Sequence, residues 1–344
     1  MHISEFDYEL PEELIAQQPL ARRDASRILV LDRNRGSWRD SVFSEFPEHL
    51  RSNDVVVVNN SRVIPARLSG HRAETGGAVE IFLVRELEPR IWEALVRPGG
   101  RLREGARVVF GDGKLIGELL DAPGQELRRV RFGCEGRFED VLAEFGSTPL
   151  PPYIKRPRGG SPADRERYQT VYSKSPGAIA APTAGLHFTD DVLAQVRAKV
   201  SVAEVTLHVG YGTFEPVRVD EVDHHSVSSE RFTISSEAAE TINHARSNGG
   251  RVIVVGTTTM RALESSANED GRIEATTGDA SLTIKPGYRF RVADALLTNF
   301  HLPRSSLLVL VSAFAGRELV LAAYGHAVEQ RYRFYSYGDC MLIL

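Results

Sequence analysis

The stretch RVIVVGTTTMRALESSA, residues 251–267, gives the clearest indication of the fold. It begins with a short apolar run, typical of a buried strand, and continues with the pattern of a helix. VVVVNN (55–60) and VAEVTLHV (202–209) also indicate strands, and SEAAETINHARSNG (236–249) indicates an amphipathic helix ending at a glycine. Strands and helices in this mixture predict an α/β core around a large mixed sheet.

A different pattern fills residues 63–148, where short strands follow one another closely. Gly-Asp-Gly at 111–113 is a tight-turn signal between two of them. Such strands predict a small antiparallel β-barrel that interrupts the core. The expected domains are an α/β catalytic core of residues 1–62 plus 149–344 and an inserted barrel of residues 63–148. The predicted barrel strands lie within VEIFLVREL (79–87), IWEALVR (91–97), RVVFGDGKLIGELL (107–120) and LRRVRF (127–132).

Two segments after the barrel have clear local signals. STPLPPYIKRPRGGSPADRER (147–167) is rich in proline, glycine and arginine, which predicts a surface loop. SSLLVLVSAFAG (305–316) begins with serines that cap helices and ends in glycine, which predicts a helix.

The composition limits the classes of function. The 344 residues carry a formal net charge of -4, which argues against coating nucleic acid through bulk charge but leaves room for a local basic patch. The two cysteines, Cys134 and Cys340, form no disulfide framework or zinc cluster, so we expect a cytoplasmic protein without a metal. The polar, acidic start and the shortness of apolar runs such as LLVLV (307–311) predict neither a signal peptide nor a membrane span.

Polar and glycine-rich loops follow two of the predicted strands. HVGYGTF (208–214) lies where a strand ends, and open α/β sheets bind ligands at the carboxyl ends of strands. A tight turn whose histidine is hydrogen-bonded within the protein explains this motif equally well. VVGTTTMRALE (254–264) brings a strand to a helix N-terminus that suits a carboxylate or phosphate, although simple capping is the more common explanation. The candidate residues here are His208, Gly210, Gly212, Thr213, Phe214, Thr257 and Thr258.

Three other segments contain candidates with ordinary structural alternatives. TNFHLP (298–303) places Asn299 and His301 before a capped helix, where they either read a heterocycle or ribose, or form an Asx turn. HHSVSSE (224–230) brings His225 near Glu230, an acid–base set or a solvated loop. YRFYSYGDC (332–340) interleaves arginine with aromatic residues, which either stack on bases or pack into the core.

The segment GAIAAPTAGLHFTD (177–190) crowds small residues around one histidine. Such a backbone allows a bound group to approach it closely.

Ten motifs in order carry a resemblance that no single one of them establishes. The chain closely resembles the S-adenosylmethionine:tRNA ribosyltransferase-isomerases of queuosine biosynthesis, from about residue 5 to its end and more loosely in the barrel. The motifs are FDYELPEELIAQQPL…RDASRILVLDR, NNSRVIPARL, PLPPYI, YQTVYS, GAIAAPTAGLHF, TLHVGYGTFEPV, VGTTTMRALE, TNFHLP, LVSAFAG and YRFYSYGD.

The resemblance implies an unusual use of S-adenosylmethionine. Its ribosyl part is transferred to 7-aminomethyl-7-deazaguanine at the wobble position of tRNA and isomerised, giving epoxyqueuosine with release of adenine and methionine. The implied partners are S-adenosylmethionine, as co-substrate, and this tRNA, with no further cofactor, no metal and no membrane. We expect a monomer.

The resemblance also suggests roles for individual residues. His187, His208 and His225 are the acid–base candidates, with Glu230 as partner. The donor or the flipped-out base is expected to lie against Thr183 and Gly185. The remaining candidates are Arg261 and Asp339 for the charged ends of the donor, and Arg62, Lys155 and Arg156 for tRNA phosphates.

One position departs from the family pattern. Relatives usually read His-x-Met-His-x-Glu where this chain has His225-Ser226-Val227-Ser228-Ser229-Glu230, so Ser228 replaces the second histidine. Ser228 keeps one alternative open, a degenerate relative that binds tRNA without catalysis. A second alternative, independent of Ser228, is an S-adenosylmethionine-dependent methyltransferase. The second would normally carry a glycine-rich loop after its first strand, and no such loop is evident.

Overall fold

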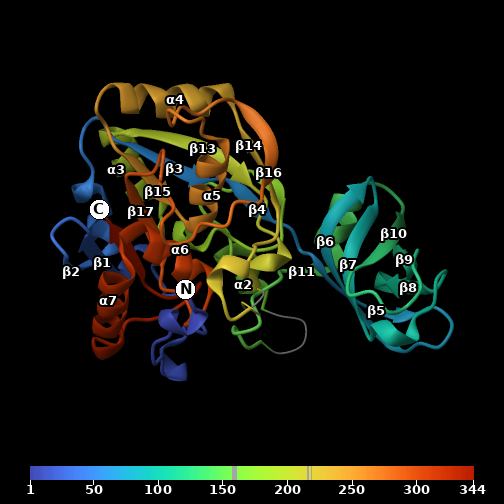
Figure 1. Cartoon of the computed structure of the whole chain (residues 1–344). Coiled ribbons are helices and arrows are strands. Elements are labelled where there is room, and N and C mark those ends of the chain that lie inside the picture. Colours follow the sequence, from blue (N-terminus) through green and yellow to red (C-terminus); the bar gives the residue numbers. More distant parts are fainter. Residues whose placement is uncertain (157–160, 215–216, 218) are drawn as a thin grey trace.

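The computed structural model describes residues 1–156, 161–214, 217 and 219–344, without the side chains of residues 101, 162, 213 and 214. It contains a large α/β body and a small barrel beside it (Figure 1). The body is built on a nine-stranded sheet with the order β16-β14-β13-β3-β15-β17-β18-β1-β2. Its strands are β1 (Arg27–Asp32), β2 (Ser37–Val42), β3 (Val55–Asn59), β13 (Ser201–Leu207), β14 (Glu230–Ile234), β15 (Val252–Val255), β16 (Thr276–Ala280), β17 (Ala295–Asn299) and β18 (Cys340–Ile343).

The sheet is mixed, as the sequence predicts. Strands β13, β3, β15 and β17 pair in parallel at its centre, and β1 pairs in parallel with β18. The pairs β13–β14, β14–β16, β17–β18 and β1–β2 are antiparallel. Strands β3 and β15 are almost entirely valine and isoleucine because both faces of the sheet are covered there.

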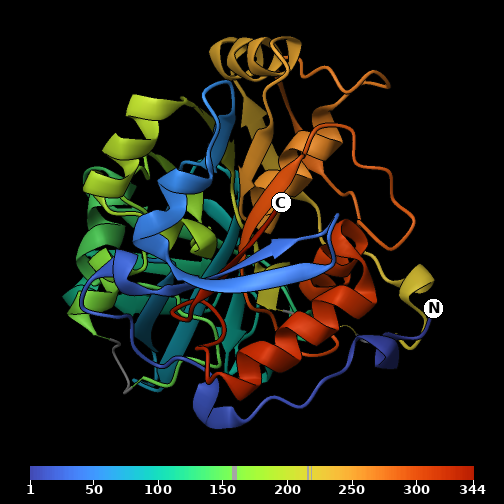
Figure 2. The ribbon, with the colours of Figure 1, turned by 90° about the vertical axis from the view of Figure 1, so that its left-hand side faces the viewer.

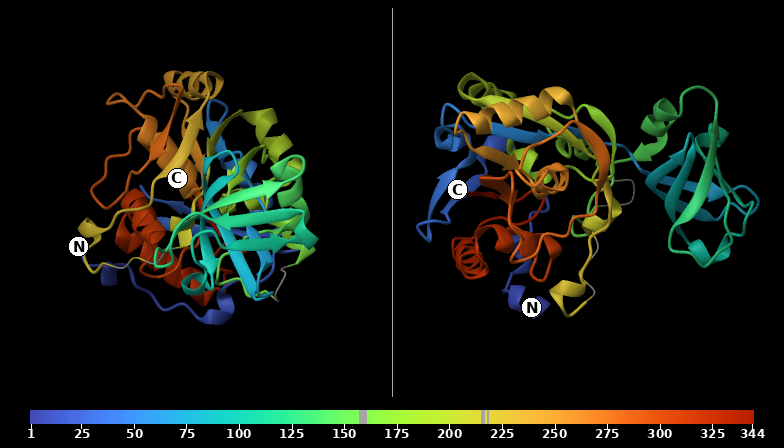
Figure 3. Two further views of the ribbon diagram at one scale, coloured as in Figure 1. Left: turned by 90° about the vertical axis from the view of Figure 1, so that its right-hand side faces the viewer. Right: turned by 45° about the horizontal axis from the view of Figure 1, so that its top comes forward.

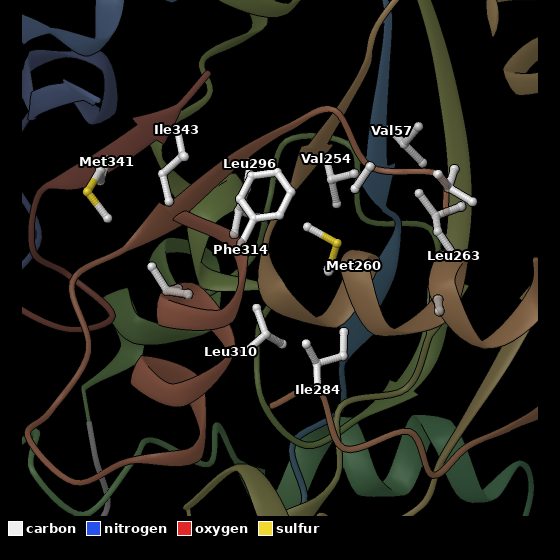
Figure 4. Close-up of a cluster of buried hydrophobic side chains, with 14 of the residues drawn as sticks. Val57, Val254, Met260, Leu263, Ile284, Leu296, Leu310, Phe314, Met341 and Ile343 are labelled. Carbon is white, nitrogen blue, oxygen red and sulfur yellow. The ribbon is translucent and has the colours of Figure 1, made fainter. Parts of the chain in front are cut away.

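Helices cover both faces of the sheet. The larger cluster holds Val57 and Val254 from the sheet and Met260, Leu310 and Phe314 from helices, as Figure 4 shows. The opposite faces of the same strands pack in a second cluster with α3. In Figure 2, α7 lies beside β1 and β2. The helices of the body are α2 (Pro162–Arg167), α3 (Asp190–Lys199), α4 (Ser236–Ser247), α5 (Thr257–Ser266), α6 (Ser306–Ala315) and α7 (Arg317–Glu329).

The second unit is a closed antiparallel barrel, as predicted. Its strands pair in the order β5-β6-β7-β10-β9-β8, and β8 pairs back with β5. The two-residue strand β11 (Gly146–Ser147) adds to β5. The right-hand view of Figure 3 shows the barrel set to one side of the body. We propose 63–148 as the bounds of this inserted domain. The barrel elements are β5 (Arg67–Arg72), β6 (Ala78–Glu88), β7 (Ile91–Arg97), β8 (Arg107–Phe110), β9 (Leu115–Leu119), β10 (Arg128–Cys134) and α1 (Phe138–Phe145).

The chain enters and leaves the barrel through two segments that belong to the core. Strand β4 (Ser61–Val63) precedes the barrel and pairs in parallel with β12 (Ser175–Ala178), which follows it. The segment predicted as a loop at 147–167 differs from that prediction, because it contains α2, in which Asp164 is buried.

Among the described residues, no single helix is long and apolar enough to cross a bilayer; α6 and α7 pass that test only as a pair, and they are bent by 115° relative to each other.

Candidate active site

A cavity of about 310 Å³ lies where β15 and β17 end. This is the carboxyl edge of parallel strands, the usual position of ligand sites in open α/β sheets, and the volume is in the range of small-molecule pockets. The walls are Ala180–Ala184, Gly256–Thr258, Thr298–Leu307, and residues from four other segments: Pro152, Tyr153, Tyr168, Val209, Tyr335 and Ser336.

The small residues of 177–190 divide into two groups with different reasons for their size. Ala180, Ala181 and Ala184 line the cavity. Gly185 instead faces Tyr172, whose hydroxyl would lie 2.0 Å from an added Cβ atom. Gly177, with φ +138°, would bring its Cβ within 2.8 Å of the His208 ring. The alanines therefore leave space for a ligand, whereas the two glycines allow close packing of the protein on itself.

Two helix N-termini meet at the cavity. Helix α5 begins after Gly256, which has φ +90°, and Gly256, Thr257 and Thr258 line the wall. Helix α6 begins after Ser305, whose hydroxyl accepts from the Leu308 N–H at 3.2 Å. Each helix start has unpaired N–H groups and the positive end of a helix dipole. Their convergence makes this part of the cavity suitable for a carboxylate.

Asn299 and His301 line the cavity from the end of β17, near the position predicted for them. His301 Nε2 lies 2.9 Å from Thr298 Oγ1, and burial lowers the pKa of His301 to about 3. The side-chain nitrogen of Asn299 lies 3.2 Å from both His187 Nε2 and the Tyr335 carbonyl oxygen. Both side chains are therefore held in place by the protein, and His301 stays neutral at physiological pH.

His187 lies behind this wall and does not line the cavity. It ends the 3-10 helix Thr183–His187 and packs 5.3 Å from the Phe43 ring. Its Nδ1 is 2.7 Å from Ser26 Oγ. Burial, assisted by the positive charges of Arg333 and Arg23, lowers the pKa of His187 to about 3.

A smaller cavity of about 30 Å³ adjoins the large one, and Ser306 and Leu307 line both. His225, Ser228, Glu230 and Arg261 also line the smaller cavity, which brings together residues predicted from separate motifs.

Glu230 and Arg261 form a buried ion pair at 2.5 Å. Glu230 also accepts from the Gly210 N–H at 2.8 Å. Arg261 donates to the carbonyl oxygens of Ser228 and Ala280. This pair joins the loop after β13 to helix α5 and fixes the floor of the smaller cavity.

Two histidines near this pair have a buried ring nitrogen without a partner among the described residues. They are Nδ1 of His208 and Nε2 of His225. Burial lowers the pKa of both, with smaller contributions from the positive charges of Arg231 beside His208 and Lys285 beside His225. Both rings are therefore neutral at pH 7 and able to accept a proton.

Other predicted residues are placed away from the cavities or have protein partners. Asp339 is buried and accepts from the backbone N–H groups of Arg27 and Arg333, both at 2.9 Å. Arg156 is also buried and pairs with Asp164 at 2.7 Å. Arg62 and Lys155 are exposed; Lys155 pairs with Glu12.

The glycine-rich motif after β13 is described in part. Gly210 and Gly212 lie beside the smaller cavity, and a Cβ on Gly212 would come within 2.4 Å of Ser228 Oγ. The side chains of Thr213 and Phe214 lie outside the described part of the chain, so their predicted roles stay predictions.

Tyr153 and Tyr335 were not among the predicted site residues. Their rings lie 3.9 Å apart between centroids at the large cavity, and Tyr153 shares a hydrogen bond of 2.5 Å with Ser336. Tyr335 has φ +73°, a strained conformation for a bulky residue that often marks functional sites. The aromatic run at 332–337 was the available signal, and packing into the core explained it as well.

Among the described residues, no group of three or more histidine, cysteine, aspartate or glutamate side chains is arranged to hold a metal ion.

Known proteins resemble this chain over its whole length. The model of the family described as "Queuosine biosynthesis protein" matches residues 3–343. Proteins named S-adenosylmethionine:tRNA ribosyltransferase-isomerase from Clostridioides difficile, Desulfitobacterium hafniense and Symbiobacterium thermophilum are each 50% identical, over 100% of both chains.

A solved structure is similar as well. The crystal structure of an S-adenosylmethionine tRNA ribosyltransferase from Thermotoga maritima is 37% identical, with a TM-score of 0.56, and the match covers 99% of this chain and 100% of that one. The fold, the cavity at the sheet edge and full-length similarity lead to one conclusion: this chain belongs to the queuosine biosynthesis protein family.

Proposed function

We propose that this protein is an S-adenosylmethionine:tRNA ribosyltransferase-isomerase. It moves the ribosyl part of S-adenosylmethionine to 7-aminomethyl-7-deazaguanine at the tRNA wobble position and isomerises it, giving epoxyqueuosine, adenine and methionine. The observation that carries this proposal is the 50% identity to three curated enzymes of that name over 100% of both chains.

The large cavity is the proposed site for S-adenosylmethionine. The methionine carboxylate is placed at the starts of α5 and α6, where N–H groups and two helix dipoles favour an anion. Ala180, Ala181 and Ala184 leave room for the rest of the donor. No other cofactor takes part in the proposal.

His208 and His225 are the proposed acid–base groups. The sulfonium of the donor acidifies the neighbouring 5′ protons, so a neutral imidazole can remove one, and adenine leaves with a proton supplied at the purine. Burial keeps both imidazoles neutral. Glu230, held by Arg261, is the proposed partner that orients this part of the site.

For tRNA we propose Arg62 and Lys155 as phosphate contacts, because both are exposed. Arg156 is a weaker candidate, since its guanidinium is buried against Asp164. We also propose a cytoplasmic monomer.

One incubation tests the activity. The protein is mixed with S-adenosylmethionine and tRNA carrying the aminomethyl-deazaguanine base, and nucleosides and small molecules are analysed by mass spectrometry. Adenine, methionine and a heavier base are expected. S-adenosylhomocysteine would instead identify a methyltransferase, and tRNA binding without any product would identify a degenerate relative in which Ser228 is the first residue to change to histidine.

A further inference from the structure

Three buried side chains form a connected chain behind the large cavity: Ser26, His187 and Asn299. Ser26 Oγ lies 3.1 Å from the Arg23 carbonyl oxygen and 2.7 Å from His187 Nδ1. Its hydroxyl can donate to either group or accept from the ring, so the contact on the other ring nitrogen sets the tautomer of His187.

The contacts of Asn299 fix both its own amide and the His187 ring. The Asn299 side-chain nitrogen faces the carbonyl oxygens of Tyr335 at 3.2 Å and Asp339 at 3.4 Å. Turning the amide over would place its oxygen against these two acceptors, so the surroundings settle the orientation of Asn299, which is usually ambiguous. The same nitrogen lies 3.2 Å from His187 Nε2 and donates to it. The neutral ring therefore carries its proton on Nδ1, which donates to Ser26 Oγ.

This orientation leaves the amide oxygen without a partner. Asn299 Oδ1 is buried, and no described protein group donates to it. A buried, unpaired acceptor is costly, so such atoms call for an explanation. Asn299 lines the cavity proposed for the donor, and Oδ1 is the amide atom left for a group bound there.

We propose that Asn299 Oδ1 accepts a hydrogen bond from an amino N–H of a bound purine-type base, and that His187 is a positioning residue that holds Asn299 for this contact. The inference rests on the proposed function, which brings two such bases to the enzyme: the adenine of the donor and the deazaguanine of the acceptor. It assigns His187 no proton transfer, because both of its ring nitrogens are engaged inside the protein. Burial, together with Arg333 and Arg23, keeps the ring neutral.

The first experiment observes His187 directly in the wild-type protein. Long-range ¹H–¹⁵N spectra of the histidine rings are recorded from pH 5 to 8 and assigned by the loss of signals in His187→Gln. We expect a ring protonated on Nδ1 alone that does not titrate in this range. A His187 that titrates near pH 6.5, or that carries its proton on Nε2, would overturn the proposal. Neither result depends on turnover, so a failure of the proposed function is distinguished from a failure of this inference.

The second experiment tests the ligand contact. Affinity is measured for S-adenosylmethionine and for its analogue with hydrogen in place of the 6-amino group, using wild type and Asn299→Ala. If adenine is the ligand base, wild type binds the analogue roughly 10- to 100-fold more weakly, and Asn299→Ala no longer distinguishes the two.

A parallel arm uses acceptor tRNA with and without the 2-amino group of the deazaguanine. If wild type distinguishes the two tRNAs but not the two S-adenosylmethionine compounds, and Asn299→Ala does not distinguish the tRNAs, the contact is with the acceptor base. If wild type discriminates in neither arm, or Asn299→Ala discriminates as well as wild type, the contact does not exist.

The third experiment separates positioning from proton transfer. Gln at 187 can still accept from Asn299 through its side-chain oxygen, whereas Leu cannot. We expect His187→Gln to keep KM within about threefold and His187→Leu to raise KM at least about tenfold, with the pH profile of kcat unchanged in both. Loss of kcat in both variants together with a lost limb of the pH profile would show that His187 transfers a proton.

Discussion

Glu230 shows how much a single residue depends on its partner. It is predicted from HHSVSSE as an acid–base companion of His225, and the structure places both at the smaller cavity. The sequence does not reveal that Arg261, 31 positions away, forms a 2.5 Å pair with Glu230. Asp339 and Arg156 illustrate the same limit. From the sequence alone, a charged residue that binds a ligand looks the same as one that is buried against a distant part of the protein.

At this scale we predict the effect of Glu230→Gln. The change leaves the buried Arg261 without its counterion, so the free energy of unfolding should fall by about 3 kcal/mol, and turnover should fall with it. Glu12→Gln is the matched control, because Glu12 forms an exposed pair with Lys155, and exposed pairs contribute little to stability. Urea unfolding and turnover assays measure both; equal stability of the two variants would contradict the prediction.

A second residue-scale prediction concerns the space in the large cavity. Ala184→Leu adds three carbons to the wall and should abolish binding of S-adenosylmethionine and turnover, while the far-ultraviolet circular dichroism stays that of the wild type. Ala322→Leu, at an exposed position on α7, is the control and should leave both unchanged. Normal turnover by Ala184→Leu would show that the donor does not lie there.

At the scale of elements, local signals located α5 and α6 within a residue or two, at 257–266 and 306–315. They do not indicate α7, because a glycine such as Gly316 usually ends a helix. Gly316 ends α6, but with φ +90° it also begins α7 at a sharp bend. They also missed the meeting of two helix starts at one cavity. That arrangement depends on strand order, which brings β15 beside β17, and not on either motif alone.

The meeting of helix starts predicts different consequences for two similar caps. Ser305 caps α6 at the cavity, and Ser235 caps α4 through a 3.2 Å bond to the Ala238 N–H. Replacing either by alanine should lower the free energy of unfolding by about 1 kcal/mol. Ser305→Ala should also raise KM for S-adenosylmethionine several-fold, whereas Ser235→Ala should not. Thermal melts measure the stability of both variants, and initial rates measure their KM. Equal KM values for Ser305→Ala and Ser235→Ala would argue against an anion at the start of α6.

For the whole molecule, the mixed α/β body and the barrel were both predicted correctly. The apolar runs of buried strands and the closely spaced short strands of 63–148 can be recognised locally in the sequence. The distribution of buried histidines was not predictable. His187 and His301 are neutral in the folded state because the surrounding body excludes water, and this follows from the assembled structure.

These two histidines predict how stability depends on pH. Their folded pKa values of about 3 lie below the value near 6.5 of an exposed histidine, so the unfolded chain binds more protons between those limits. Stability is therefore full above about pH 6.5 and falls as the pH drops, with a slope approaching about 1.4 kcal/mol per pH unit for each histidine. Urea unfolding at pH 7, 6 and 5 measures it. His187→Gln should reduce the slope by the contribution of one histidine, and an unchanged slope in this variant would contradict the prediction.

The strand order also has a consequence for synthesis on the ribosome. Strand β1 is made early, yet its partner β18 consists of residues 340–343, almost the last of the chain. β3 likewise waits for β13 and β15. The barrel, by contrast, pairs only segments between residues 67 and 147, so it can form while the rest of the body is still being translated. The nascent chain must therefore keep the valine-rich β3 from aggregating until β13 and β15 have been made.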